Sequence, residues 1–483
     1  MNTTPEHLSD RGENLRSIRG IAQRALARAA GAPLVPGNAV RLLLDAEQNY
    51  AAWHTAIAAA KRTIYFENYI FRPDVVGKRF RDALVARAED GVKVRVLLDW
   101  IGSLHTSRKF WEPLLKLGGQ VRYHNPPRLD SPLGWLSRDH RKTLAVDGTL
   151  GFVSGICVSN TWLGDASRRI EPWRDTGVEI RGPAVADLIP AFAQVWAENG
   201  DPISKDELTS FTPAAPAGEI PVRVIASAPN LAGIYRLDLL IASMAERRLW
   251  LTDAYFAALP AYVQALRAAA RDGVDVRLLV PGGSDLPWLR PLTTAGYRPL
   301  LEAGVRVFEW NGSMLHAKTA VADGRWARVG STNLNVASWI SNYELDVAIE
   351  DPGFANEMET TYERDLTHST EVVLKKRRPK RLPSPGDSRS RPGGGSLARV
   401  TAGAIRLGRT VGAAITNHRV LGTAEAFPLF WIAMSLLALA ALAVFLPHVV
   451  AWTAATFFTL LSLMLLLRSW RLRRAGGKLR DES

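Results

Sequence analysis

The sequence predicts an α/β protein whose two similar halves form one body, followed by a C-terminal transmembrane helical hairpin. Three observations in the 483 residues lead to this fold class. A strand–helix–strand pattern at 62–98 recurs at 248–280, a short His–Lys–Asp motif occurs in each half, and two long apolar runs lie near the C-terminus. Strands that alternate with helices are typical of layered α/β domains.

The N-terminal segment, residues 1–37, precedes the repeated body. Its opening, MNTTPEHLSDRGENLRS, contains no apolar run, so we expect no secretory signal peptide. Residues 15–31 place Leu15, Ile18 and Ala22 on one face of an amphipathic helix. Such a helix either lies in a membrane interface or packs against the body. The second alternative is favoured at least as strongly, because the apolar face is mostly Ala.

The body divides into halves at 38–205 and 206–372. In each copy of the repeat an apolar strand ends in aromatic residues, a helix follows, and Asp-Gly-Val leads into a second apolar strand. Gly91 and Gly273 fall where the end of a helix favours a residue that tolerates positive φ. The Pro- and Gly-containing region around 201–220 is the predicted join. Two such halves facing each other would bring both motifs to one cleft.

The motif His-x-Lys-x4-Asp occurs in DHRKTLAVDG and again in LHAKTAVADG. One copy alone is most often ordinary alternation on a strand, but two copies, each followed by a Gly/Ser turn, indicate a shared function. Lys also stands in both motifs although Arg outnumbers Lys by 48 to 12 in the chain. Imidazole, ammonium and carboxylate together can attack a phosphodiester. The predicted catalytic residues are His140, Lys142, Asp147, His316, Lys318 and Asp323.

Small and polar residues follow the second motif, in the order Gly330-Ser331-Thr332-Asn333. Glycine lets a backbone approach closely, and Ser331 and Asn333 offer neutral donors to phosphate oxygens. If LHAKTAVAD is a strand, His316 and Lys318 point to the same side because side chains alternate with a period of two. The sequence therefore predicts a phosphate site between these groups.

The chain resembles the phospholipase D superfamily and, more narrowly, bacterial cardiolipin synthases of the B type. The resemblance rests on both motifs, on GSTN at 330–333, NYE at 342–344 and PWRDTGVEIRGPAV at 172–185, and on the ENYIF and DAYF strands. It covers about residues 38–370 and implies two phospholipase D-like halves forming one catalytic body. The family commonly has Gly-Gly-x-Asn after the first motif, whereas this chain has Ser-Gly-Ile-Cys at 154–157.

Cys157, the only cysteine, therefore stands where the family has a phosphate-contacting Asn. A thiol is a weaker donor than an amide, and we expect a tolerated replacement in preference to a redox role. A single cysteine also precludes an internal disulfide and fits a reducing compartment. The residues expected to bind or orient the phosphate and its attackers are Ser331, Asn333, Glu344, Asp175, Gly155 and Cys157.

The resemblance implies a two-step transfer through a phosphohistidine. His140 is the implied nucleophile and His316 the implied acid and base, although the near-symmetric sequence alone leaves these roles open. Glu344 is the implied carboxylate partner of His316, and Asp175 is our expected counterpart for His140. The motif aspartates are expected to brace the site through hydrogen bonds. No Cys/His cluster or paired-carboxylate motif is present in the sequence, so we expect no bound metal and no cofactor.

The C-terminal region begins with a basic, Pro/Gly/Ser-rich tether at 373–426. Two uncharged apolar runs of membrane-spanning length follow within 427–467, separated only by Pro447-His448, and a basic tail occupies 468–483. Arginines on both flanks predict that both ends lie in the cytoplasm. A buried soluble hairpin is the alternative, which the arginine cluster disfavours. We thus expect the catalytic body on the cytoplasmic face of a bacterial inner membrane.

The net charge of +13 and the pI of about 10.0 suit either nucleic acid or an anionic membrane. Much of the excess flanks the predicted spans, so we expect anionic phospholipid and the membrane as partners and no nucleic acid. The sequence predicts no oligomeric state. The expected activity is transfer of a phosphatidyl group between two phosphatidylglycerol molecules. Hydrolysis by a phospholipase D is the alternative, and a membrane-tethered nuclease is less favoured, because single-motif nucleases of the superfamily dimerise whereas this chain has both motifs.

Overall fold

The computed structural model describes residues 20–374, except 128–136, 210, 212–213 and 287–289, and a few isolated positions between 434 and 462. The predicted hairpin, its tether and its tail lie outside the described residues, apart from those positions and residues 373–374 at the start of the tether. No helix in the described part of the chain is long and apolar enough to cross a bilayer. The chain divides into two compact units, 1–386 and 387–483, and the first contains both halves of the repeat.

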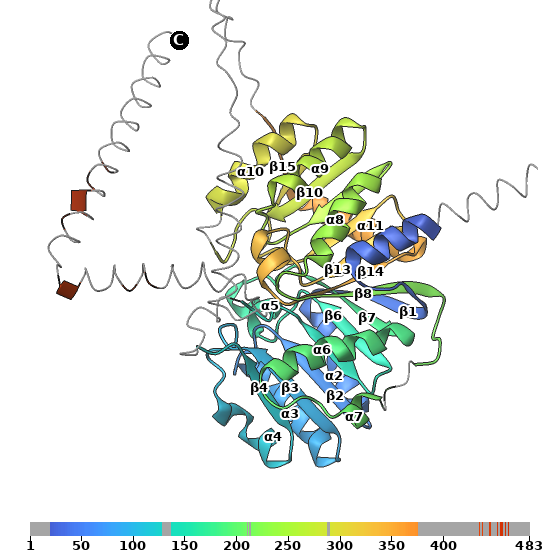
Figure 1. Ribbon diagram of the computed structural model, residues 1–483, viewed down its shortest axis with the longest axis vertical. Helices are drawn as coiled ribbons and strands as arrows, with labels where there is room; N and C mark the ends of the chain where they lie inside the picture. The colour runs from blue at the N-terminus through green and yellow to red at the C-terminus, as the bar shows by residue number, and fades with distance from the viewer. Residues whose placement is uncertain are drawn as a thin grey trace, which may run out of the picture. The chain divides into compact units, whose positions relative to one another are not determined.

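One mixed sheet of fifteen strands runs through both halves (Figure 1). The halves contribute their strands in mirrored order on either side of the centre. From one edge to the centre the first half provides β4 (Gln120–His124), β3 (Lys93–Asp99), β2 (Thr63–Asn68), β5 (Thr143–Val146), β6 (Leu150–Ser154), β7 (Thr176–Arg181) and β1 (Val35–Leu44). The second half continues with β8 (Ile220–Ser227), β14 (Glu344–Ile349), β13 (Trp326–Gly330), β12 (Thr319–Ala322), β9 (Arg248–Thr252), β10 (Asp275–Pro281), β11 (Arg306–Trp310) and β15 (Ser369–Val372).

The halves meet where β1 and β8 pair antiparallel at the centre of the sheet. The register pairs Val35 with Val222 and Asn38 with Ile220, with a bulge between the two pairs. Asn38 is fully buried, and its Nδ2 donates to the carbonyl oxygens of Val35 (2.8 Å) and Ile220 (3.1 Å). A buried amide needs such partners, so this side chain fixes the junction of the two halves.

The repeat read from the sequence forms the same unit twice. β2, α3 (Val75–Glu89) and β3 make one parallel crossover, and β9, α9 (Pro260–Arg271) and β10 make the other. Parallel neighbours require such a crossover connection, which the helix provides. The glycines after the two helices adopt the predicted positive φ, 81° at Gly91 and 93° at Gly273.

Helices cover both faces of the sheet (Figure 1). On one face α6 (Leu188–Glu198) and α11 (Pro352–Thr367) share a single core that spans both halves and includes Trp196 and Tyr362. On the other face each half has a core of its own. The helices there are α2 (Asp45–Ala59), α3 and α4 (Glu112–Lys116) in the first half and α8 (Gly233–Met244), α9 and α10 (Arg290–Glu302) in the second. Short turns are α5 (Asn160–Leu163), α7 (Lys205–Thr209) and a π-helical turn at Ala337–Ser341.

The N-terminal helix, described from residue 20 to 30, packs against the second half. Leu26 and Ala30 are buried in the core beneath α8, and Gln23 donates to Glu350 at 2.5 Å. For these residues the structure agrees with packing against the body, one of the two alternatives that the sequence left open.

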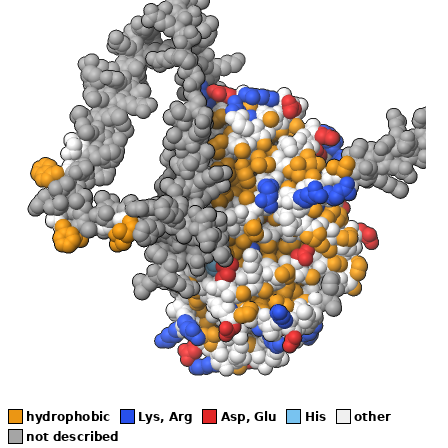
Figure 2. Space-filling model, viewed as in Figure 1, with side chains coloured by type: hydrophobic (Ala, Val, Ile, Leu, Met, Phe, Trp, Pro, Cys, Tyr) orange, Lys and Arg blue, Asp and Glu red, His pale blue; other side chains and the backbone are white. Residues whose placement is uncertain are grey.

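The positive charge of the chain is concentrated outside the body. Residues 375–483 contain 18 of the 60 Lys and Arg residues but only 4 of the 47 Asp and Glu residues. The rest of the chain is therefore almost neutral. Figure 2 shows basic and acidic side chains scattered among apolar ones over the face in view, with no single basic patch.

Candidate active site

Both His–Lys pairs lie in extended segments just before a strand. His140 and Lys142 precede β5, and His316 and Lys318 precede β12. The expectation that these residues lie within the strands is thus wrong by a few positions. The reason is that each segment leaves its own sheet neighbours and pairs with backbone from the other half of the protein.

The segment of His140 pairs with the segment that leads into β14. Asp139 and Tyr343 form a parallel bridge, the His140 N–H donates to the Tyr343 carbonyl at 2.9 Å, and the Tyr343 N–H donates to the Arg138 carbonyl at 2.9 Å. Glu344 is the next residue along, so its carboxylate lies beside the imidazole. The His140 Nδ1 is 2.9 Å from one Glu344 oxygen and 3.1 Å from the other.

The segment of His316 is bridged in the same way to the segment before β7. Arg174 and Leu315 form a parallel bridge, and the His316 N–H donates to the Arg174 carbonyl at 2.7 Å. Asp175 follows Arg174, and its Oδ2 lies 2.7 Å from the His316 Nδ1. Each imidazole is therefore oriented by a carboxylate from the opposite half.

This arrangement corrects the pairing expected from the sequence, which joined Glu344 to His316 and Asp175 to His140. The sequence places a carboxylate close to each motif along the chain but does not show which backbone segments will pair. The two bridges between the halves determine the partners instead: they place Glu344 beside His140 and Asp175 beside His316.

Each carboxylate is held by further donors. Ser331 Oγ donates to Glu344 at 2.5 Å, and Asn342 Nδ2 donates to its other oxygen at 3.3 Å. Ser331 is fully buried and gives its single hydrogen to this carboxylate, so it orients Glu344 and has no hydrogen left for a phosphate. Asp175 accepts from Trp162 Nε1 at 3.0 Å and from the Thr176 N–H at 2.8 Å.

Gly155 occupies the position in the first half that Ser331 occupies in the second. A Cβ at Gly155 would lie 2.2 Å from Asp175 Oδ1, a distance that two heavy atoms cannot adopt without a shift. Gly155 therefore makes room for the carboxylate that orients His316.

The lysines reach the same region. Lys142 Nζ donates to the carbonyl oxygen of His140, and Lys318 Nζ donates to that of His316. Each ammonium also lies over an aromatic ring, Tyr69 at 5.2 Å for Lys142 and Tyr255 at 5.9 Å for Lys318. These tyrosines come from the ENYIF and DAYF strands, and they are not among the predicted site residues although their repeated placement was a signal.

Burial and charge set the ionisation of the second pair. Burial, reinforced by Lys318, lowers the pKa of His316 to about 4. Burial alone would raise the pKa of Asp175, but His316 and Lys318 bring it down to about 2. Burial lowers the pKa of Lys318 to about 8. At neutral pH the pair is thus a carboxylate and a neutral imidazole, and because the Asp175 carboxylate can only accept, it favours the tautomer with the hydrogen on Nδ1 and the lone pair on Nε2.

The pKa values of the first pair, His140 and Glu344, shift in the same directions as those of the second. Burial lowers the pKa of His140, with Glu344 acting in the opposite direction. Burial would raise the pKa of Glu344, but His140 and the adjacent donors hold it below its usual value. His140 is also neutral with Nε2 available, so either imidazole can act as a nucleophile or as a base.

The two motif aspartates lie away from the imidazoles. Asp147 accepts from the backbone N–H groups of Lys61, Arg62 and Thr63 at 2.7 to 2.8 Å. Asp323 accepts from residues 246–248 in the same way at 2.8 to 2.9 Å. Each stands at the far end of a four-residue strand, roughly 13 Å or more from its histidine at about 3.3 Å per residue. The expectation that they act at or brace the site is wrong, because they hold the turn at the opposite end of the strand.

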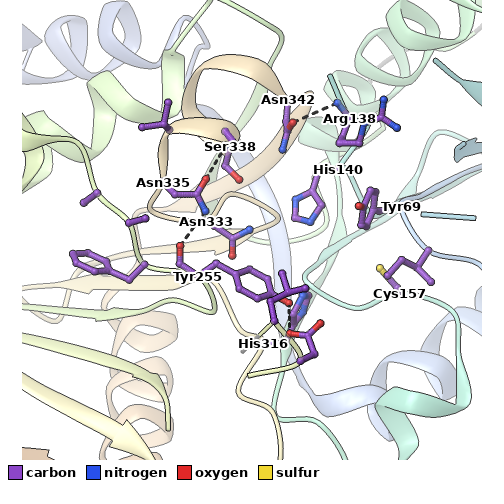
Figure 3. A pocket seen from close by; sticks show the side chains of 18 of the residues that line it. Tyr69, Arg138, His140, Cys157, Tyr255, His316, Asn333, Asn335, Ser338 and Asn342 are labelled. Carbon is purple, nitrogen blue, oxygen red and sulfur yellow. Dashed lines mark hydrogen bonds between the residues drawn. The ribbon is translucent and has the colours of Figure 1, made fainter. Parts of the chain in front are cut away.

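Both imidazoles open onto one cavity of about 880 Å³. Figure 3 shows them near the centre of this cavity, with Cys157 on one side and Asn333 on the other. Asn333 Oδ1 is buried with no hydrogen-bond partner among the described residues. Burial raises the pKa of Cys157, so its thiol is neutral. Trp162, Trp173 and Arg138, which are not among the predicted site residues, also line the cavity.

The described residues contain no group of three or more His, Cys, Asp and Glu side chains placed to hold a metal ion. The polar groups that line the cavity include instead the two imidazoles and the amides of Asn333, Asn335 and Asn342, while each buried lysine donates to the carbonyl oxygen of its own histidine. Together they can attack a phosphodiester, stabilise its charge and move one proton.

Two α/β halves that share one sheet and bring two His–Lys pairs to one cavity define a two-motif protein of the phospholipase D class. The family model described as "Cardiolipin synthase, PLD-like domain" matches residues 54–194 and 240–366, and the chain belongs to this family.

Relatives agree with this assignment, and a solved structure shares the fold. The chain is 35% identical to Cardiolipin synthase A of Pseudomonas aeruginosa (strain LESB58), over 74% of this chain and 72% of that protein. It is 30% identical to the cardiolipin synthase of Alkalihalophilus pseudofirmus, over 70% of this chain and 68% of that protein. Phosphatidylserine synthase of Haemophilus influenzae shares the fold with a TM-score of 0.58 and 14% identity, covering 73% of this chain and 92% of that chain. The narrower B type stays a prediction.

Proposed function

We propose that the protein is a cardiolipin synthase-type phosphatidyltransferase, which converts two molecules of phosphatidylglycerol into cardiolipin and glycerol. The observation that carries this proposal is the pair of neutral imidazoles, each oriented by a buried carboxylate, that open onto one cavity. The family and its 30–35% identical relatives support the same reaction.

In the first step an imidazole Nε2 attacks the phosphorus of the donor lipid. The N–P bond forms, the P–O bond to the headgroup glycerol breaks, and the other imidazole gives a proton to the departing oxygen. The incoming phosphodiester anion raises the pKa of that second imidazole, which allows it to carry the proton. Lys142 and Lys318 stabilise the charge on the phosphorus oxygens.

In the second step the hydroxyl of an acceptor lipid gives its proton to the second imidazole and attacks the phosphohistidine. The O–P bond forms and the N–P bond breaks, which restores both side chains. Resemblance favours His140 as the nucleophile and His316 as the acid and base. The imidazoles have equivalent partners, so the two roles depend on how the substrates bind.

The wall of the cavity suits a lipid. Beyond the polar centre it is lined on the side of the second half by apolar side chains that include Phe256, Val263, Leu286 and Val336. The nearly neutral body offers none of the excess of Lys and Arg that nucleic-acid binding requires. Hydrolysis of phospholipid to phosphatidic acid is the second candidate, because it uses the same residues with water as the acceptor.

Membrane attachment through 427–467 belongs to the same proposal, with the body at the cytoplasmic face of the inner membrane and anionic phospholipid as substrate. The basic flanks of the two apolar runs support it. Removal of residues 397–483 should reduce binding to vesicles containing phosphatidylglycerol while activity on detergent-dispersed lipid remains. Unchanged vesicle binding would contradict the anchor.

The experiment that tests the function supplies labelled phosphatidylglycerol in mixed micelles with a chelator and separates the lipid products. We expect cardiolipin and free glycerol from the full-length protein, no turnover from His140→Ala or His316→Ala, and normal turnover from His368→Ala, whose exposed imidazole lies at the end of α11. Phosphatidic acid as the only lipid product would favour the hydrolase, and activity in either catalytic variant would refute the shared site.

A further inference from the structure

The two halves differ two residues before each catalytic histidine. Arg138 precedes His140, whereas Met314 precedes His316 at the same offset. Arg138 lines the cavity (Figure 3). Among the described residues, Arg138 is therefore a third cation at the site, in addition to the two symmetric lysines, and the second half has no counterpart at the same offset.

Arg138 is only 9% exposed, and its hydrogen bonds are incomplete. Nη1 lies 3.1 Å from Asp99, but Nε and Nη2 are buried and have no hydrogen-bond partner among the residues that the structure describes. Leaving donors of a buried guanidinium unpaired is costly, so such a group in a cavity wall indicates a site for an anionic ligand. A guanidinium also presents a planar fork that matches the oxygens of a phosphate.

The position of Arg138 is fixed relative to His140. Its carbonyl accepts from the Tyr343 N–H at 2.9 Å, and the bridge between Asp139 and Tyr343 lies between it and the histidine. Its charged end is held at Nη1 by Asp99, which also accepts from the Gly102 N–H at 2.9 Å and the Asp139 N–H at 3.0 Å. An anion bound to the free nitrogens would thus have a defined place beside the reacting centre.

We propose that Arg138 binds the phosphate of the acceptor phosphatidylglycerol, and this inference rests on the proposed transfer reaction. In the proposed reaction Lys142 and Lys318 stabilise the charge on the reacting phosphate of the donor lipid. The only other anion that the reaction requires is the phosphate of the acceptor, at the opposite end of the glycerol whose hydroxyl attacks. Holding it at Arg138 directs that hydroxyl toward the N–P bond in preference to water. Arg138 is therefore a specificity-determining residue for transfer over hydrolysis.

The test compares two acceptors in one enzyme. Labelled glycerol, which has no phosphate, exchanges into phosphatidylglycerol through the same phosphohistidine, while cardiolipin formation uses an acceptor that carries a phosphate. Loss of a charge-assisted hydrogen bond typically weakens binding by about 10- to 100-fold. In Arg138→Met, which copies Met314, we expect cardiolipin formation to fall at least about tenfold more than glycerol exchange. We also expect the ratio of phosphatidic acid to cardiolipin to rise.

Two further variants separate binding from folding. Arg138→Met with Asp99→Asn removes the buried carboxylate that the single variant would leave unpaired, and it should show the same selective loss. Arg41→Met removes an exposed arginine from β1, whose side chain is 61% exposed, and should change neither reaction. Equal loss of exchange and cardiolipin formation in both Arg138 variants would overturn the proposal. Wild-type protein that supports neither reaction would instead refute the proposed function.

Discussion

Replacing Glu344 with Gln tests the exchanged pairing of carboxylates and imidazoles. The change removes a negative charge that is fully buried next to His140, whose side chain is 10% exposed. The transition state places a positive charge on the imidazole, with charge centres roughly 4 Å apart, which corresponds to about 4 kcal/mol at an effective dielectric constant of about 20. Since about 1.4 kcal/mol equals a factor of ten, turnover should fall about a thousandfold.

The assay that locates the effect is NMR of protein labelled with ¹⁵N in histidine. Glu344 raises the pKa of His140 against the effect of burial, so its loss should lower that pKa further and shift the His140 Nδ1 signal. The His316 signal should stay in place. Asp175→Asn should shift the His316 signal and leave that of His140 in place. Glu371→Gln, at the edge strand β15, should change neither signal.

The refuting result is specific. Suppose that Glu344→Gln shifts the His316 signal and leaves that of His140 unchanged. Glu344 would then be the partner of His316, as expected from the sequence, and the pairing of Glu344 with His140 would be wrong. A loss of turnover without any change in a histidine signal would show that Glu344 acts by some route other than the imidazole.

Three further predictions concern charge, space and the distant aspartates. Lys318 must be protonated to stabilise the phosphate, and its pKa is about 8. Therefore kcat/KM should fall as pH rises through about 8, and a flat pH profile there would contradict this role of Lys318. Gly155→Ala should displace Asp175 and cut turnover by about 30-fold or more. Gly283→Ala, with open space around its Cβ, should have no effect. Equal turnover in the two variants would refute the close contact between residue 155 and Asp175. Asp323→Ala should lower the unfolding free energy by about 1–3 kcal/mol through lost backbone hydrogen bonds while folded protein keeps its activity, as thermal unfolding and turnover together would show.

The sequence predicted the features that repeat along the chain. The crossover units, the positive φ of Gly91 and Gly273 and the presence of both histidines at one cavity follow from local patterns of apolar residues, glycine and motif spacing. These patterns act over short distances, so a single sequence contains them. The helix at 20–30 had two open interpretations, because an Ala-rich face is compatible with either.

The features that depend on contacts between the halves were not predictable in the same way. The partner of each imidazole is set by bridges at Tyr343 and Arg174, residues whose pairing has no signature in either segment. Arg138 was hidden for a different reason, since it is one of 48 arginines. Aligning the halves at their histidines, which sets Arg138 against Met314, would have revealed it.

The pairing of β1 with β8 joins two similar halves of a single chain in one sheet. In a dimer of identical subunits, a change beside one histidine is imposed on the other, so both sides of the site stay the same. In a single chain the two sides are encoded separately, so one side has a guanidinium at Arg138 and the other a thioether at Met314. A site built from two similar halves can thus be directional, with one half binding the first lipid and the other selecting the second.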